Sequence, residues 1–223
     1  MPRGKFISFE GGEGCGKTTQ RNRLAERLKA MQLEIVTTRE LGGTPGAEAL
    51  RPVMQSGDID RWDAVSELLI VMAGRHDHTE KLIKPSLAAG KWVLSDRFFD
   101  STHVYQGYAA NRPIEQVKAV QKIAVGDFVP DLTFIFDYDP TKGLQRAMQD
   151  ASTRTEENTR FERKGLEFHQ RVREGFLTIA RENPQRCVVI NAEGTIEEVE
   201  ARVWAVVSER FGLNERTLAA HHA

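Results

Sequence analysis

Residues 11–19, which read Gly-Gly-Glu-Gly-Cys-Gly-Lys-Thr-Thr, constrain the fold more than any other part of this sequence. They match the pattern G-x-x-x-x-G-K-[ST] of a phosphate-binding P-loop. Residues 5–10 before them form a short apolar run that is typical of a buried strand, and residues 20–31 carry apolar side chains at helical spacing. A strand, a glycine-rich turn and a helix in this order are the setting in which the pattern binds phosphate.

Each residue type in this loop has a role in holding an anion. The glycines allow backbone conformations that other residues rarely adopt, and they leave room for a phosphate. The N–H groups of the loop and of the following helix then point at the anion. Lys17 offers a cation to the β- and γ-phosphates, and Thr18 offers a hydroxyl to Mg²⁺. A plain glycine-rich turn is the weaker interpretation, so we predict that a nucleoside triphosphate contacts Gly11, Gly12, Glu13, Gly14, Cys15, Gly16, Lys17, Thr18 and Thr19.

Composition narrows the class of protein. The 223 residues contain 40% hydrophobic and 28% charged residues, which is ordinary for a globular chain with a full core. The net charge of −1 argues against a nucleic-acid partner. There is no apolar run of about eighteen residues, and the first strand begins almost at once, so we expect neither a membrane span nor a signal peptide. Two cysteines, Cys15 and Cys187, favour a reducing compartment, and hence the cytoplasm.

Short apolar runs alternate with helical patterns along the chain. The runs expected to be strands are residues 5–10, 34–38, 92–95, 131–137 and 188–190. The expected helices are 20–31, 47–55, 62–74, 79–89 (bent at Pro85), 100–107, 114–125, one opening at Pro140, 161–181 and 195–211. This order predicts an α/β fold, the three-layer P-loop NTPase type, in which helices cover both faces of a five-stranded parallel sheet. We expect one domain over residues 1–212 and a polar tail over 213–223.

Charged residues directly follow two of the expected strands. They are the pairs Arg39-Glu40 and Asp96-Arg97, and ligands of parallel sheets bind beyond the carboxyl ends of the strands. One such pair alone would suggest a salt bridge at the sheet rim. Two pairs beside a P-loop favour a second anion site, because a kinase with a phosphorylated acceptor must neutralise that acceptor. Further candidates, which could equally be solvated helix surface, are Arg51 and Arg75.

A polar segment lies between the helix that opens at Pro140 and the helix predicted over residues 161–181. Residues 150–159 contain almost no apolar side chain, which suits either a surface loop or a lid, and we take about 150–162 as a candidate lid. A lid arginine could close over a triphosphate and stabilise charge in the transition state. The candidates are Arg154, Arg160 and Arg163. Elsewhere, Tyr105 and Gln106 could edge a base, although Tyr105 could equally be core. The histidines show no metal-ligand spacing.

Taken together, these residues resemble the thymidylate kinase family of nucleoside-monophosphate kinases. The resemblance runs from residue 6 to about residue 206. The motifs that carry it are Glu10 with the P-loop, Thr38-Arg39-Glu40 with Gly42-Gly43-Thr44, Asp96-Arg97-Phe98, Asp100-Ser101-Thr102, Tyr105-Gln106-Gly107, Gly126-Asp127-Phe128, Pro130-Asp131 and Phe168-His169. The family implies transfer of a phosphoryl group from ATP to dTMP with Mg²⁺, and a homodimer.

The resemblance also assigns roles on the donor side. Lys17 and Thr18 would hold the ATP phosphates and magnesium, and Asp96 would orient an arginine or bind water-bridged magnesium. Gly14 stands where some members of the family have an arginine. The glycine matches the bacterial pattern, in which the lid supplies the catalytic arginine. Arg160 is the best match for that arginine, and Arg154 is the second. Beyond the acceptor phosphate itself no general base is needed.

On the acceptor side, the resemblance implies that Arg39 and Arg97 hold the acceptor phosphate while Glu40 orients them or binds water-bridged magnesium. Glu13 would turn toward the 3′-hydroxyl of the deoxyribose. The residues expected to line the base and sugar pocket are Arg51, Val71, Arg75, Thr102, Tyr105 and Gln106.

Three positions depart from the family pattern. Leu41 replaces a proline, Val104 replaces an alanine, and Val71 replaces the phenylalanine that stacks on thymine. An aromatic pair contributes about 0.5–1.5 kcal/mol beyond its buried area. Val71 therefore leaves a second acceptor open, another 5-substituted dUMP such as 5-hydroxymethyl-dUMP. A P-loop NTPase without phosphoryl transfer to a small molecule is a third interpretation, but it would need a water-positioning residue and switch loops.

Overall fold

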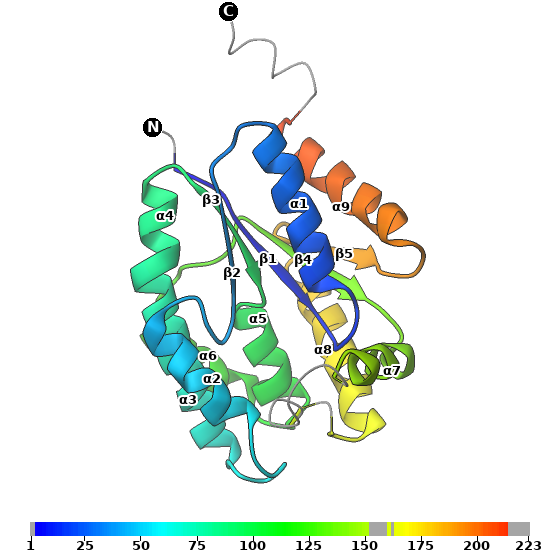
Figure 1. The fold of residues 1–223 in the computed structure, drawn as a ribbon. Helices are drawn as coiled ribbons and strands as arrows, with labels where there is room; N and C mark the ends of the chain where they lie inside the picture. The colour runs from blue at the N-terminus through cyan, green and yellow to red at the C-terminus, as the bar shows by residue number, and fades with distance from the viewer. Residues whose placement is uncertain (1–2, 152–159, 162, 214–223) are drawn as a thin grey trace, which may run out of the picture.

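Five parallel strands form the centre of the protein (Figure 1). The computed structural model describes residues 3–151, 160–161 and 163–213. The strands lie in the order β2-β3-β1-β4-β5, and each neighbouring pair is parallel. Their bounds are β1 Phe6–Gly11, β2 Ile35–Arg39, β3 Trp92–Asp96, β4 Leu132–Asp137 and β5 Cys187–Asn191. The predicted α/β fold with a five-stranded parallel sheet is confirmed.

The helices follow the predicted order, with π-helical turns that the sequence pattern did not indicate. Their bounds are α1 Lys17–Ala30, α2 Pro45–Gln55, α3 Ala64–His78, the π-helix η1 Thr79–Ile83, α4 Lys84–Ala88, α5 Phe99–Thr102, the π-helix η2 His103–Tyr108, α6 Ile114–Val125, α7 Pro140–Ala151, α8 Leu166–Glu182 and α9 Ile196–Phe211. Pro85, where a bend was predicted, is the second residue of α4 and follows the π-helical turn η1 without a break. The helix expected from residue 161 begins instead at Leu166, after Gly165.

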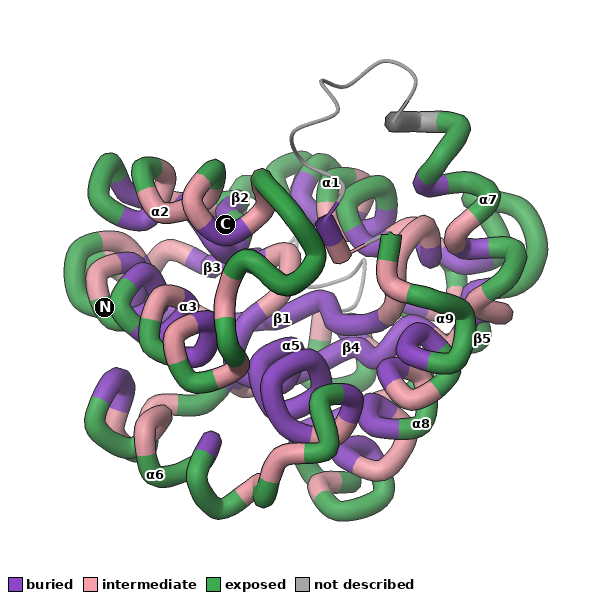
Figure 2. Tube along the Cα trace, turned by 90° about the horizontal axis from the view of Figure 1, so that it is seen from below, coloured by how far each residue is buried: buried purple, intermediate pink, exposed green. Residues whose placement is uncertain are grey.

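Helices cover both faces of the sheet, and alternate strand residues pack against each layer. On one face, Phe9, Phe134 and Phe136 belong to a buried cluster with residues of α1 and α9. On the other face, Ile135 packs with residues of η2 and α8. Figure 2 shows buried residues concentrated in β1, β4 and α5, with exposed residues along the outer faces of the surrounding helices. The chain therefore folds as the predicted three layers.

A capping box closes the start of α9. The hydroxyl of Thr195 accepts a hydrogen bond from the backbone N–H of Glu198 at 3.2 Å, and the Glu198 carboxylate accepts one from the N–H of Thr195 at 2.8 Å. In the described ranges, none of the helices is long and apolar enough to cross a membrane.

Candidate active site

A large cleft opens beyond the carboxyl ends of β1, β2 and β3. Its volume is about 1190 Å³, which is large enough for more than one small-molecule ligand. Most of the site residues predicted from the sequence line it. They are Glu13, Gly14, Cys15, Gly16, Lys17, Thr18, Thr19, Arg39, Glu40, Arg51, Val71, Arg75, Asp96, Arg97, Thr102, Tyr105 and Gln106.

The P-loop presents an uncapped helix N-terminus to this cleft. Gly16, with φ of 90°, precedes α1, and no side chain caps the first turn. The N–H groups at the start of α1 are thus available to an anion. The ammonium group of Lys17 donates a hydrogen bond to the carbonyl oxygen of Gly12 at 2.6 Å. This geometry is that of a phosphate-binding loop.

Gly14 is required by the close approach of α7. A Cβ atom built on Gly14 would lie 2.0 Å from the carbonyl oxygen of Gly143, and one built on Gly143 would lie 2.4 Å from the carbonyl oxygen of Glu13. The two backbones therefore pack together without side chains. An arginine at position 14 is excluded by this contact, so any arginine that reaches the donor phosphates must come from elsewhere.

Thr18 and Asp96 lie together at the edge of the P-loop. The Thr18 hydroxyl donates a hydrogen bond to the Asp96 carboxylate. Both are hard oxygen ligands of the kind that Mg²⁺ prefers, and both line the cleft. The described part of the chain holds no group of three or more His, Cys, Asp or Glu residues that could bind a metal by themselves. The donor set fits a magnesium ion that shares its coordination with phosphates and water.

Glu13, Arg97 and Tyr105 form one hydrogen-bonded group in the cleft wall. The Glu13 carboxylate accepts a hydrogen bond from Arg97 at 2.9 Å and from the Tyr105 hydroxyl at 2.8 Å. Burial tends to raise the pKa of Glu13, but the charges of Arg97 and Lys17 outweigh it and lower the pKa to about 2. Glu13 is therefore a fixed carboxylate at neutral pH. The same contacts place the Tyr105 ring in the site, which the sequence left open.

The carboxylate of Glu40 points away from the arginines that it was expected to orient. It accepts a hydrogen bond from Nε of Arg75 at 2.8 Å and contacts Nδ1 of His78 at 3.2 Å. Burial raises the pKa of Glu40, yet the charge of Arg75 and the contacts with His78 lower it overall. The prediction that Glu40 orients Arg39 or Arg97 is wrong, because its side chain faces α3, where both partners lie.

Three arginines that line the cleft, Arg39, Arg51 and Arg97, lie close to one another. Arg39 is half exposed and pairs with Glu48 at 3.0 Å, and Arg51 donates to the carbonyl oxygen of Leu41 at 2.8 Å. Burial and the nearby charges of Arg39 and Arg97 lower the pKa of Arg51. Like charges held this close favour an anion between them. Arg21, which the sequence analysis missed, also lines the cleft and donates to the carbonyl oxygen of Thr38 at 2.7 Å.

Arg75 reaches the cleft wall with most of its N–H groups already engaged. Nε and NH2 contact the Glu40 carboxylate, NH1 contacts the Thr102 hydroxyl and the Met72 sulfur, and NH2 also contacts the Phe98 carbonyl oxygen. A guanidinium has five N–H donors in total. Arg75 thus lies near the expected base edge, but a hydrogen bond to a base would have to share or displace one of these contacts.

Arg160 does not lie where a catalytic lid arginine was expected. Its side chain is 1% exposed, and it pairs with the Glu67 carboxylate at 2.7 Å. Its other N–H groups donate to carbonyl oxygens of residues 54, 58 and 59. Arg160 does not line the cleft. Its N–H groups are instead hydrogen-bonded to residues of α2, of α3 and of the turn between them. The second candidate, Arg154, lies outside the described residues, and Arg163 donates to the carbonyl oxygen of Gly57 at 2.6 Å.

The apolar end of the cleft contains an aromatic ring that the sequence analysis missed. Val71 lines the cleft in a buried cluster with Leu41 and Met54, and Phe161 packs against this cluster. The Phe161 ring meets the Tyr105 ring edge-on, with centroids 5.7 Å apart. The triplet Arg160-Phe161-Glu162, directly after the polar segment, was the only sequence signal. Phe161 thus supplies an aromatic face beside the position that Val71 leaves aliphatic.

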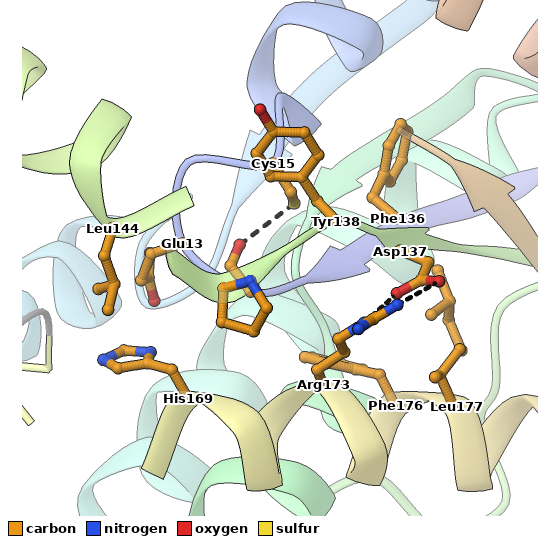
Figure 3. Close-up of a pocket in the computed structure, with 13 residues that line it drawn as sticks. Glu13, Cys15, Phe136, Asp137, Tyr138, Leu144, His169, Arg173, Phe176 and Leu177 are labelled. Atoms are coloured by element: carbon orange, nitrogen blue, oxygen red, sulfur yellow. Dashed lines mark hydrogen bonds and ion pairs between the residues drawn. The ribbon is translucent and has the colours of Figure 1, made fainter. Parts of the chain in front are cut away.

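A second, much smaller cavity lies behind the P-loop (Figure 3). Its volume is about 20 Å³, which is enough for about one water molecule. The Cys15 thiol donates to the carbonyl oxygen of Gly12 at 3.2 Å on one side, and Arg173 pairs with Asp137 at 2.5 Å on the other. Gly12, Glu13 and Cys15 line this cavity, and of these three only Glu13 and Cys15 also line the cleft. The cavity is too small for a substrate.

Known proteins resemble this chain over nearly its whole length. A family model described as thymidylate kinase matches residues 9–203. A thymidylate kinase from Caulobacter vibrioides is 49% identical over 213 residues, which cover 96% of this chain and 100% of the relative. A thymidylate kinase from Nitrobacter winogradskyi is 46% identical over 208 residues, with 93% and 90% covered. A crystal structure of thymidylate kinase from Ehrlichia chaffeensis shares 36% identity with a TM-score of 0.72, and the match covers 92% of this chain and 99% of that one.

These matches agree with the fold and with the geometry of the cleft. The family model spans the P-loop from Phe9 onward, both charged strand ends and the predicted lid segment. The relatives are covered almost end to end, so the likeness is not confined to one motif. This chain belongs to the thymidylate kinase family.

Proposed function

We propose that this protein transfers the γ-phosphoryl group of ATP to dTMP, giving ADP and dTDP. As a member of the thymidylate kinase family it is an enzyme, a nucleoside-monophosphate kinase. The observation that supports the proposal is that one cleft is lined both by the P-loop and by a group of arginines, Arg39, Arg51 and Arg97. A binding protein for ATP alone has no need of the second group.

In the proposed mechanism, the P-loop holds the donor. Lys17 exchanges its contact with the Gly12 carbonyl oxygen for the β- and γ-phosphates, and the N-terminus of α1 supplies N–H donors. Thr18 and Asp96 hold Mg²⁺, which neutralises charge on the phosphates when bound. Arg154 remains the sequence-based candidate for a lid arginine, since Arg160 is occupied elsewhere.

The acceptor lies across the cleft in this proposal. Arg97 and Arg39 hold its phosphate, whose own oxygen attacks the γ-phosphorus in line, so no side chain is needed as a general base. Glu13, held by Arg97 and Tyr105, faces the deoxyribose hydroxyl. Catalysis is then positioning and charge neutralisation. No observation in the described residues favours 5-hydroxymethyl-dUMP or a non-kinase function over this assignment.

The wider organisation extends the same proposal. We take residues 1–212 as one kinase domain and expect a homodimer. Exposed apolar side chains on α3 and α6, among them Leu69 and Ile123, support a subunit contact on these helices. Two free, buried cysteines support a reducing compartment such as the cytoplasm. Sedimentation at several protein concentrations tests the dimer, and a single monomer peak throughout would contradict it.

The activity is tested by ADP release coupled to a spectrophotometric assay, with ATP, Mg²⁺ and a panel of acceptors. The panel is dTMP, dUMP, 5-hydroxymethyl-dUMP, dCMP, dGMP and AMP. We expect the highest kcat/KM with dTMP. The variant Lys17→Ala should fold but lose turnover. Absence of turnover with every pyrimidine deoxynucleotide would refute the proposal.

A further inference from the structure

Glu67 is a buried carboxylate beside the cleft that the proposed mechanism does not use. It lies on α3, is 5% exposed, and divides its two oxygens between two partners. Oε1 accepts a hydrogen bond from Nε2 of Gln106 at 2.7 Å, and Oε2 accepts one from NH1 of Arg160 at 2.7 Å. A buried charge is costly unless it is paired and hydrogen-bonded. Arg160 supplies that pairing, so Glu67 acts as an acceptor on both oxygens.

This carboxylate determines which end of the Gln106 amide faces the cleft. A carboxylate accepts hydrogen bonds and donates none, whereas an amide has a donor end and an acceptor end. Nε2 of Gln106 must therefore face Glu67. Gln106 lines the cleft, and its Oε1 accepts no hydrogen bond from the described residues. The amide thus presents to a ligand one acceptor oxygen and the second hydrogen of Nε2.

An acceptor oxygen and a neighbouring N–H match one edge of a uracil-type base. Thymine and uracil carry a donor at N3 beside carbonyl acceptors, while cytosine carries an acceptor at N3. Arg75, which also lines the cleft, already donates to Glu40, Thr102 and the Phe98 carbonyl oxygen. The Gln106 oxygen, in contrast, accepts none of the hydrogen bonds found among the described residues.

We propose that Glu67 is a positioning residue for acceptor specificity: it fixes the Gln106 amide so that the cleft selects a pyrimidine with N3–H over cytosine. The inference rests on the proposed function, since it assumes that the base of the acceptor lies beside Gln106. Arg160 has a defined part in it. By holding Oε2 of Glu67, Arg160 keeps Oε1 directed at Gln106.

The substitution Glu67→Gln gives a directed test, because Arg160 can only donate hydrogen bonds. The oxygen of the new amide must face Arg160, so its NH₂ group faces Gln106. Gln106 must then turn its own oxygen toward position 67 and its NH₂ toward the cleft. The side chain at position 67 keeps its size. Gln106, however, then presents its NH₂ group instead of its oxygen to the edge of the base.

We expect Glu67→Gln to lower the ratio of kcat/KM for dTMP to that for dCMP by about tenfold, mainly through a higher KM for dTMP. The KM for ATP should stay unchanged. Glu80→Gln, on the neighbouring η1 turn and paired with Lys84 at the surface, is the matched control and should leave the ratio as in the wild type.

Two outcomes would overturn the proposal. One is an unchanged ratio in a folded Glu67→Gln protein, and the other is an equal loss on both acceptors, which a merely structural role would produce. If Glu67→Gln does not fold, the double variant Glu67→Met/Arg160→Met removes both charges of the buried pair together, which costs less stability than leaving one of them unpaired. It frees the Gln106 amide and should lower the same ratio. Failure of the wild type on dTMP would refute the proposed function instead.

Discussion

Substitution of Arg160 by alanine distinguishes two roles that predict opposite results. A lid arginine that stabilises the transition state contributes about 10³–10⁵ in kcat, and its loss changes stability little. A buried arginine that clamps two helices contributes mainly to stability. The structure supports the second role, because Arg160 is 1% exposed and does not line the cleft.

The magnitude follows from the groups that Arg160→Ala leaves behind. Glu67, whose side chain is 6% exposed, would keep a buried charge without its partner. Breaking a buried pair in this way costs about 3–5 kcal/mol, and the carbonyl oxygens that lose N–H donors add to this cost. For a chain of this size, 1 kcal/mol shifts Tm by about 2–4 °C. Arg160→Ala should therefore lower Tm by about 6–20 °C.

Thermal unfolding followed by circular dichroism and by tryptophan fluorescence measures this shift, and kcat is measured well below the lower Tm. We expect kcat to fall by less than about tenfold, far below the loss of a transition-state arginine. Arg163→Ala is the matched control. That arginine is exposed and donates to one carbonyl oxygen, so its removal should change stability by at most about 1 kcal/mol. A Tm unchanged within about 2 °C together with a thousandfold loss of kcat would refute the reasoning.

Three further predictions concern the metal, the core and the base. Asp96→Asn should raise the Mg²⁺ concentration needed for half-maximal rate, and an unchanged titration would place the metal elsewhere. Burial and the nearby charge of Asp100 raise the pKa of Glu10 from 4.5 to about 8, so the folded protein keeps a proton that the unfolded chain releases. The free energy of unfolding should then fall as pH rises from about 5 to 8, and Glu10→Gln should remove this fall in urea titrations; equal slopes would contradict it. Phe161→Ala should raise the KM for dTMP several-fold with little change in the KM for ATP, whereas a rise in both would indicate a general loss of structure.

Local signals in the sequence predicted the sheet and the P-loop. The P-loop could be predicted because its strand, turn and helix are adjacent in the chain. The strands were short apolar runs because helices cover both faces of the sheet. The start of α8 at Leu166 rather than 161 was missed, since Phe161 continues the apolar pattern of the helix although it packs into the cleft.

The partners of charged residues could not be predicted, because they lie far apart in the chain. Glu40 follows Arg39 directly, yet its carboxylate pairs with Arg75, 35 positions away. Arg160 meets Glu67 across 93 positions. A pattern of charges at strand ends indicates that an anion site exists, but the placement of α3 decides which arginines remain available to a ligand. An arginine that is available to a ligand and an arginine that is held by a buried carboxylate cannot be told apart in the sequence.

The base end of the cleft shows how the departure at Val71 is compatible with the family's activity. Phe161 brings an aromatic ring to the cluster that contains Val71, and it does so from the segment that Arg160 anchors. Because Arg160 and Phe161 are consecutive, the ion pair with Glu67 holds the backbone that carries the ring. The other oxygen of Glu67 holds Gln106, so one carboxylate is linked both to the backbone of Phe161 and to the Gln106 amide, the two groups that we propose contact the base. Acceptor recognition in this chain should therefore respond to Glu67 more than to Val71, and the combined effect of Phe161→Ala and Glu67→Gln on the dTMP to dCMP ratio should depart from the sum of the separate effects.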